Sequence, residues 1–376
     1  MNTTNVNKAL YIGSFDPITL GHMDIIRRAS AMSEFLTVAI GNNPNKKYMF
    51  EFRERAGLVQ DAVKLLNLSN VFVQTNPVEY LTADYARIYG YNIIVKGART
   101  AQDFDYEKLI HEISVTQQRE IETVLLFSST HLSHVSSSAA KELARFQGLV
   151  HEYVPIHVKA AMEAKLGQYI IGVTGTIGSG KSSFCQMVSG TTHINMDTLS
   201  HELLVDSQLP LAVQTREKIM NRFGTCDRKK LGEAVFGNPE ELAALNAILK
   251  EPMLTRLREK MAGKKGIIFL EGALLAEMNW LFLCNNRVIL VKTPDPEEHT
   301  RRLRARGHSD EQIARRIASQ YDYDEKIAVI AKQMNKDQFG KCLIFDSQNP
   351  DWHDATGEIQ QFIQGLSRAK IEPKMP

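Results

Sequence analysis

Short apolar runs alternate with amphipathic stretches along the first part of the chain, in the rhythm of strands and helices. We expect helices between the apolar runs. Two further helices are expected, one from Ser136 to near Gly148 and one over Ile156–Leu166. This alternation predicts a parallel sheet with right-handed crossovers and a ligand crevice at the carboxyl ends of its strands. The candidate strands are Ala9–Ile12, Phe35–Ile40, Val71–Val73, Asn92–Val95 and Thr123–Phe127.

The same rhythm restarts after Gly167, so we expect a domain over residues 1–166 and a second over 167–376, joined by almost no linker. The expected strands are Tyr169–Val173, His193–Asn195, Gly266–Leu270, Val288–Val291 and Leu343–Phe345. Helices are expected at Pro210–Phe223, Pro239–Leu249, Pro296–Arg306, Asp310–Ile330 as one long element, and Asp354–Ala369, before a disordered end from Glu372.

Composition narrows the class of protein. A length of 376 residues suits two domains, and a net charge of +2 gives no long-range field for a nucleic-acid backbone. No stretch is long and apolar enough for a membrane helix, and the N-terminus does not resemble a signal peptide. The four cysteines are scattered along the chain: Cys185, Cys226, Cys284 and Cys342. We therefore expect free thiols, neither a zinc site nor disulfides, and a cytoplasmic protein.

The segment Gly13–His22 follows the first expected strand and has the features of a phosphate-binding turn. Gly13 lets the main chain approach a phosphate, and Ser14 offers a hydroxyl. Gly21 and His22 open a helix, whose N-terminus favours negative charge. His22 could hold the α-phosphate of ATP; taken alone, a buried structural histidine is the competing interpretation.

Three further blocks accompany this turn, at Asn43–Phe50, Lys96–Glu107 and Val135–Ser138. Together with Tyr11–His22 they resemble bacterial phosphopantetheine adenylyltransferase in order and spacing. The resemblance implies a Rossmann-like nucleotidyltransferase sheet. It also implies transfer of AMP from ATP to 4′-phosphopantetheine, giving dephospho-CoA and pyrophosphate by direct attack on the α-phosphorus. A family resemblance to hexameric enzymes leaves a homo-oligomer possible.

The same resemblance assigns the residues of this first site. It makes His22, Lys46 and Arg99 catalytic, and Ser14, Lys46 and Lys96 substrate-binding. Serine at 14 stands where threonine is usual, and lysine at 96 where arginine is common. The implied ATP-binding residues are Ser14, Phe15, His22, Gly97, Arg99, Glu107, Ser136, Ser137 and Ser138.

A second glycine turn, Gly175–Ser182, fits the pattern G-x-x-x-x-G-K-[ST] between an expected strand and helix. Its main-chain N–H groups would surround phosphates, Lys181 would neutralise them, and Ser182 would ligate Mg²⁺. Asp197 follows the next strand, where a carboxylate could serve as base or reach the metal ion. The arginines of 301–306, with Arg315 and Arg316, form either a solvated helix face or a lid over the phosphates.

These features, with the segments Asn195–Asp197 and Phe236–Leu249, resemble dephospho-CoA kinase, a P-loop kinase fold with a helical lid. The resemblance makes Lys181 and Asp197 catalytic and gives Ser182 and Asp197 to the metal. The chain departs from the family's pattern at Asn195, at Lys250–Pro252, at Ala273–Leu275 and at Asp346–Ser347. The implied ATP-binding residues are Gly178, Ser179, Gly180, Lys181, Ser182, Ser183, Arg302 and Arg306.

Three hypotheses follow for an α/β chain of two such domains. The first is a bifunctional enzyme of coenzyme A biosynthesis, with Mg²⁺ as cofactor and ATP, 4′-phosphopantetheine and dephospho-CoA as small-molecule partners. The second keeps the adenylyltransferase but makes the kinase-like half a nucleotide-binding or regulatory module. The third keeps both reaction types with other acceptors, since periodicity and a P-loop do not name the acceptor.

Overall fold

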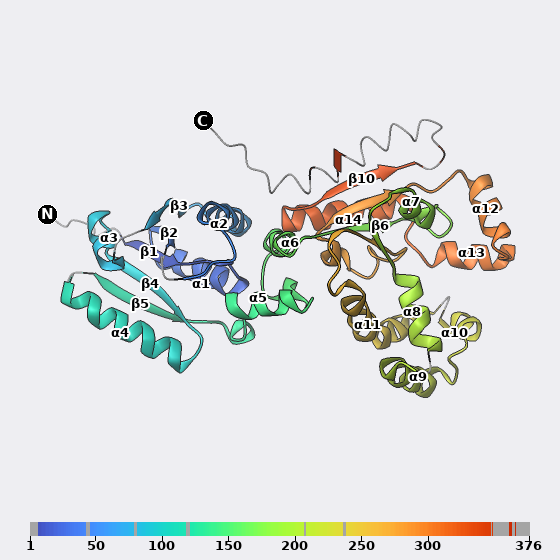
Figure 1. The fold of residues 1–376 in the computed structure, drawn as a ribbon, viewed down its shortest axis with the longest axis horizontal. Coiled ribbons are helices and arrows are strands. Elements are labelled where there is room, and N and C mark those ends of the chain that lie inside the picture. The colour runs from blue at the N-terminus through green and yellow to red at the C-terminus, as the bar shows by residue number, and fades with distance from the viewer. Residues whose placement is uncertain are drawn as a thin grey trace. The chain divides into compact units, whose positions relative to one another are not determined.

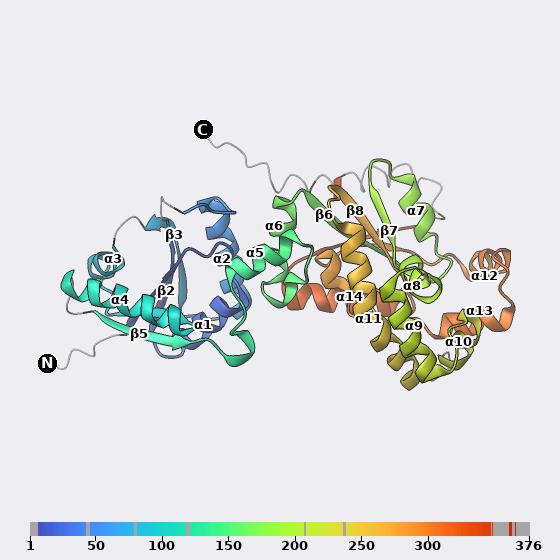
Figure 2. The same ribbon diagram turned by 60° about the horizontal axis from the view of Figure 1, so that its bottom comes forward.

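The computed structural model describes residues 7–42, 46–78, 81–117, 121–206, 208–235, 238–346, 348, 361, 362 and 365 (Figures 1 and 2). The chain divides into two compact units, Met1–Lys165 and Leu166–Pro376. Each has its own five-stranded parallel sheet. Within the described residues, no helix has the length and apolar character that crossing a membrane requires.

The first unit is a sheet in the order β3-β2-β1-β4-β5 with helices on both faces. Its central strand β1 pairs with both β2 and β4, so the strand order reverses at β1. A crevice opens at such a reversal, beyond the carboxyl ends of the strands. The strands are β1 (Lys8–Gly13), β2 (Phe35–Gly41), β3 (Val71–Val78), β4 (Ile93–Ala98) and β5 (Glu122–Phe127).

Helices of the first unit pack in pairs. Helix α1 contacts α2, and α3 contacts α4, as the right-handed crossover rule requires for the two faces of the sheet. Helices α5 and α6 follow the last strand (Figure 1). Their bounds are α1 (Leu20–Ser30), α2 (Phe52–Leu66), α3 (Thr82–Ile88), α4 (Ala101–Gln117), α5 (Ser137–Arg145) and α6 (Ile156–Lys165), with 3-10 turns η1 (Thr130–Leu132) and η2 (Val150–Glu152).

The second unit repeats the architecture in the order β10-β9-β6-β8-β7, and its strand order reverses at β6. The P-loop leaves the carboxyl end of β6 and opens helix α7. Phe184 of α7 is fully buried against Phe269 and Phe345 of the sheet, which anchors that helix. The strands are β6 (Gln168–Thr174), β7 (Thr192–Asn195), β8 (Gly266–Glu271), β9 (Arg287–Val291) and β10 (Lys341–Phe345).

Helices α8, α9 and α11 contact one another, and α12 contacts α13 (Figure 2). The helices are α7 (Lys181–Met187), α8 (Met196–Val205), α9 (Pro210–Phe223), α10 (Arg228–Val235), α11 (Pro239–Met261), α12 (Pro296–Ala305), α13 (Asp310–Ala318) and α14 (Tyr323–Asp337), with the 3-10 turn η3 (Leu281–Cys284).

All ten expected strands are confirmed, but two helix predictions in the second half are wrong. Helix α11 continues through Pro252 to Met261, because Leu254 and Leu257 bury their side chains beyond the proline and offset the hydrogen bond it removes. The expected single helix Asp310–Ile330 is two helices, since Asp322 caps a new start with Glu325. Most of the expected helix Asp354–Ala369 and the end from Glu372 lie outside the described residues.

Candidate active sites

The first glycine turn leaves β1 through Phe15, whose φ of 43° lies in the left-handed region. Its ring is 1% exposed and stands edge-on to the imidazole of His22, with centroids 5.1 Å apart. Phe15 therefore packs against His22 and does not line the neighbouring cavity. A Cβ at Gly13 would lie 3.0 Å from the Phe15 ring, a tight contact that would require the ring to shift.

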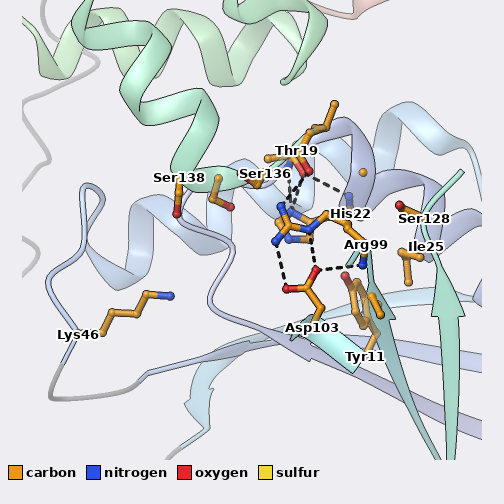
Figure 3. Close-up of a pocket in the computed structure, with 15 residues that line it drawn as sticks. Tyr11, Thr19, His22, Ile25, Lys46, Arg99, Asp103, Ser128, Ser136 and Ser138 are labelled. Atoms are coloured by element: carbon orange, nitrogen blue, oxygen red, sulfur yellow. Dashed lines mark hydrogen bonds and ion pairs between the residues drawn. The ribbon is translucent and has the colours of Figure 1, made fainter. Parts of the chain in front are cut away.

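Thr19 and His22 form a reciprocal cap at the start of α1. The Thr19 main-chain N–H donates to His22 Nδ1 at 3.0 Å, and the His22 N–H donates to the Thr19 hydroxyl at 3.3 Å (Figure 3). Because Nδ1 accepts, the proton of the neutral ring sits on Nε2. Burial lowers the pKa of His22 to about 4, aided by the positive charges of Arg99 and Lys46. At neutral pH, His22 is thus an uncharged N–H donor.

A cavity of about 250 Å³ lies over this cap, at the carboxyl ends of β1 and β4. Arg99 lines it and is held by Asp103, whose Oδ2 accepts from both the Arg99 main-chain N–H and Nε. Figure 3 shows these two residues beside His22, with Lys46 on the other side of the pocket. The cavity contains His22, Lys46, Gly97, Arg99, Ser136, Ser137 and Ser138 from the residues expected in the sequence.

The three serines differ in their roles at the start of α5. Ser136 accepts from the Ala139 N–H as the helix cap, and the Ser137 hydroxyl donates to the Pro17 carbonyl at 2.8 Å. Both therefore have local partners, whereas Ser138 stands at the helix start facing the pocket (Figure 3). A helix N-terminus at this place favours a bound anion.

Three other expected residues, Ser14, Lys96 and Glu107, lie outside the cavity lining. Lys46 donates to the Ser14 hydroxyl at 3.1 Å, so these two form a pair at the edge of the site. Lys96 and Glu107, expected to bind substrate and ATP separately, form an ion pair of 3.1 Å with each other. Sequence reasoning missed the role of Thr19, although its spacing three residues before His22 is that of a helix cap.

The second site is built on the P-loop between β6 and α7. Gly175 has a φ of 151°, and a Cβ there would lie 2.5 Å from the Val291 carbonyl. Lys181 is 7% exposed and donates from Nζ to the carbonyls of Gly175 and Thr176. Burial lowers the pKa of Lys181 to about 8, against the opposing charges of Asp197 and Glu271. The lysine carries its charge at neutral pH and lies inside the loop.

Glu271, at the carboxyl end of β8, organises the polar groups next to the P-loop. Its Oε1 accepts from the Ser182 hydroxyl at 2.7 Å, and its Oε2 accepts from Asn195 Nδ2 at 2.8 Å. His193 Nε2 lies 2.7 Å from the same Oε2. Sequence reasoning gave Glu271 no role; its position at the end of an apolar strand was the available signal.

Asp197, Glu271, Lys181 and Ser182 line one cavity of about 240 Å³. The hydroxyl of Ser182 and the two carboxylates are hard oxygen donors, which suit Mg²⁺. One further ligand-like group among the described residues, Cys185 with His193 and Glu271, shares Glu271. Burial raises the pKa of Cys185 to about 12, so its thiol stays protonated and is a poor ligand.

The arginines are divided between the P-loop and solvent. Arg302 donates from Nη1 to the Ser179 carbonyl at 3.4 Å and pairs with Glu298, while Arg306 lines the cavity of Asp197. Arg301 pairs with Glu298 at 72% side-chain exposure, as a solvated helix face would. Ser179 itself is fully buried, whereas Gly178, Gly180 and Ser183 line a neighbouring cavity beside Arg302 and Arg306.

The two halves of the chain match different protein families. Residues 10–143 match the cytidylyltransferase-like family model, and residues 169–338 match the dephospho-CoA kinase model. The phosphopantetheine adenylyltransferase of Alkaliphilus metalliredigens is 42% identical over 156 residues, covering 42% of this chain and 97% of the relative. That of Synechococcus elongatus is 44% identical over 154 residues, covering 41% and 90%.

Among solved structures, TT1252 from Thermus thermophilus is 26% identical with a TM-score of 0.41, covering 52% of this chain and 97% of that one. The sequence matches carry the assignment. The chain belongs to the phosphopantetheine adenylyltransferase family through its N-terminal half, to which a dephospho-CoA kinase domain is joined.

Proposed function

We propose that the first site transfers AMP from ATP to 4′-phosphopantetheine and that the second phosphorylates the ribose 3′-hydroxyl of the resulting dephospho-CoA. The observation that carries the first step is the neutral His22, held by Thr19. Among the described residues its Nε2–H has no hydrogen-bond partner, so it can donate to a phosphate oxygen. The choice of substrates is supported by the relatives named phosphopantetheine adenylyltransferase.

In the first step, an oxygen of the 4′-phosphate attacks the α-phosphorus of ATP as the bond to the β-phosphate breaks and pyrophosphate leaves. His22 Nε2–H would donate to the α-phosphate oxygen that gains charge, which is electrostatic stabilisation of the transition state. Lys46, paired with Ser14, would neutralise the approaching phosphate. Arg99, oriented by Asp103, would hold the phosphates of ATP.

In the second step, the ribose hydroxyl attacks the γ-phosphorus of ATP and ADP leaves. Asp197 lies in the same cavity as Lys181 and would accept the hydroxyl proton. Ser182 with Glu271 would hold Mg²⁺, and Asp197, which lines the same cavity, would share it. The bound metal would neutralise phosphate charge. Arg302 and Arg306 would close over the phosphates.

Asn195 bears on whether the second half turns over, because the related pattern has a carboxylate there. In this chain its amide caps α8 through Oδ1 and donates to Glu271 through Nδ2. An aspartate would place a second negative charge against Glu271 and could not donate. Asn195 thus holds the Glu271 carboxylate that also accepts from Ser182, so the departure at this position leaves the proposed metal-binding pair in place.

Site-specific variants separate the two activities. His22→Gln should abolish formation of dephospho-CoA from 4′-phosphopantetheine while leaving phosphorylation of added dephospho-CoA intact. Asp197→Asn should do the reverse. A chain that binds ATP yet never phosphorylates added dephospho-CoA, with or without Asp197→Asn, would support the regulatory interpretation of the second half.

A further inference from the structure

Arg55 of α2 is a buried cation in the first unit with no assigned role. Its side chain is among the largest that are fully buried, at 1% exposure. Among the ion pairs found between described residues, none includes Arg55. Its guanidinium donates to neutral oxygens instead. Burying a charge costs free energy, and the carboxylates that act on this one, Asp16 and Glu51, form no ion pair with it.

The acceptors of Arg55 belong to separate segments that meet at the edge of the active site. Nη1 donates to the Ser14 carbonyl at 2.7 Å and to the Gly41 carbonyl at 2.9 Å. Nη2 donates to Asn42 Oδ1 at 3.1 Å. The guanidinium also lies over the Tyr48 ring, 3.9 Å from its centroid. One side chain therefore joins the glycine turn after β1, the end of β2 and the segment that follows it.

Two of these segments carry the side chains of Ser14 and Lys46, which contact each other. Ser14 lies on the glycine turn and Lys46 lies two residues before Tyr48, and their side chains are 3.1 Å apart. Asp16 anchors the far end of the same segment by accepting from the N–H groups of Met49 and Phe50. Arg55 links this segment to the main chain of Ser14, whereas Lys46 contacts the Ser14 side chain. The planar fork meets several fixed acceptors at once, which a lysine ammonium cannot do with the same geometry.

We propose that Arg55 is a positioning residue for adenylyl transfer, which fixes Ser14 relative to Lys46 by holding the Ser14 carbonyl and the Tyr48 ring on one rigid guanidinium. The inference rests on the proposed function of the first site. Arg55 itself acts through Ser14 and Lys46 and does not contact the substrates. A misplacement of about 1 Å at reacting groups can lower a rate by about 100-fold.

Arg55→Lys keeps the charge and removes the fork, and Arg53→Lys is its matched control, an exposed arginine on the same helix. Arg55→Lys should lower kcat for dephospho-CoA formation by about 10- to 100-fold, with KM for ATP within about threefold. Arg53→Lys should leave kcat unchanged. Lys46→Met should cost about 100-fold in the unmodified chain but under about tenfold in Arg55→Lys, because Lys46 is already misplaced there.

Independent, multiplicative effects of Arg55→Lys and Lys46→Met would overturn the proposal, as would an unchanged kcat in Arg55→Lys. If Arg55→Lys does not fold, Tyr48→Leu takes its place, since it removes the ring beneath the guanidinium. It should show the same coupling to Lys46→Met, and independence would again overturn the proposal.

An unmodified chain that forms no dephospho-CoA would contradict the proposed function, and hydrogen exchange would then decide the role of Arg55. Loss of the fork should speed exchange at the Met49 and Phe50 amides at least tenfold relative to Arg53→Lys, while amides of α5 keep their rates. Equal exchange in the two variants would overturn the positioning role.

Discussion

The protonation state of His22 is the most specific physical statement about the first site, and lowering the pH perturbs it directly. An ordinary histidine has a pKa of 6.5, and burial, with the charges of Arg99 and Lys46, lowers that of His22 to about 4. The difference corresponds to about 3 kcal/mol of folding free energy. That contribution is complete above pH 6.5 and is lost as pH falls toward 4, because the unfolded chain takes up the proton first.

Nitrogen-15 NMR of the histidine side chains measures this state without relying on turnover. At pH 5.5, a histidine with pKa 6.5 is about 90% protonated, whereas one with pKa 4 is about 3% protonated. The side-chain resonances of His22 are those that disappear from the spectrum of the His22→Gln variant. They should show a neutral ring with its proton on Nε2 at pH 5.5. A protonated ring, or a proton on Nδ1, would refute the reasoning from burial and from the Thr19 N–H.

Other substitutions test the same picture. Thr19→Val removes the hydroxyl cap of α1 and should lower the Tm of the first domain by about 2–4 °C, read by calorimetry, with a fall in adenylyl transfer; an unchanged Tm would contradict the cap. Glu271→Gln should lower dephospho-CoA phosphorylation by about 100-fold and spare adenylyl transfer, whereas the exposed control Glu297→Gln should change neither; equal rates would exclude Glu271 from the metal site. Lys326→Met leaves the Glu277 carboxylate without its buried partner and should cost about 3–5 kcal/mol in urea unfolding of the second domain, recovered in part by adding Glu277→Gln; a loss under about 1 kcal/mol would contradict the pairing.

The strands and the glycine turns could be predicted because each depends on local pattern. Buried parallel strands are apolar runs, and β1 and β6 are followed by glycines that the turn geometry requires. Helix ends were less predictable. Pro252 is tolerated inside α11 only because residues distant in sequence bury Leu254 and Leu257, which no local signal reveals.

The site residues also differ in whether a local sequence pattern reveals them. His22, Lys181 and Ser182 belong to short motifs, so the sequence alone makes them candidate site residues. Glu271 and Arg55 act through residues far along the chain, 89 positions from Ser182 and 41 from Ser14. Their roles depend on the strand order, and a single sequence does not report which strands lie side by side.

The central claim is that one chain carries out two consecutive reactions. Mass spectrometry of the full chain with 4′-phosphopantetheine, ATP and Mg²⁺ tests it most directly, with Lys181→Met as the matched control. The account predicts dephospho-CoA first and then CoA from the unmodified chain, and dephospho-CoA alone from Lys181→Met. Absence of dephospho-CoA would contradict the first reaction, and dephospho-CoA without CoA from the unmodified chain would contradict the second.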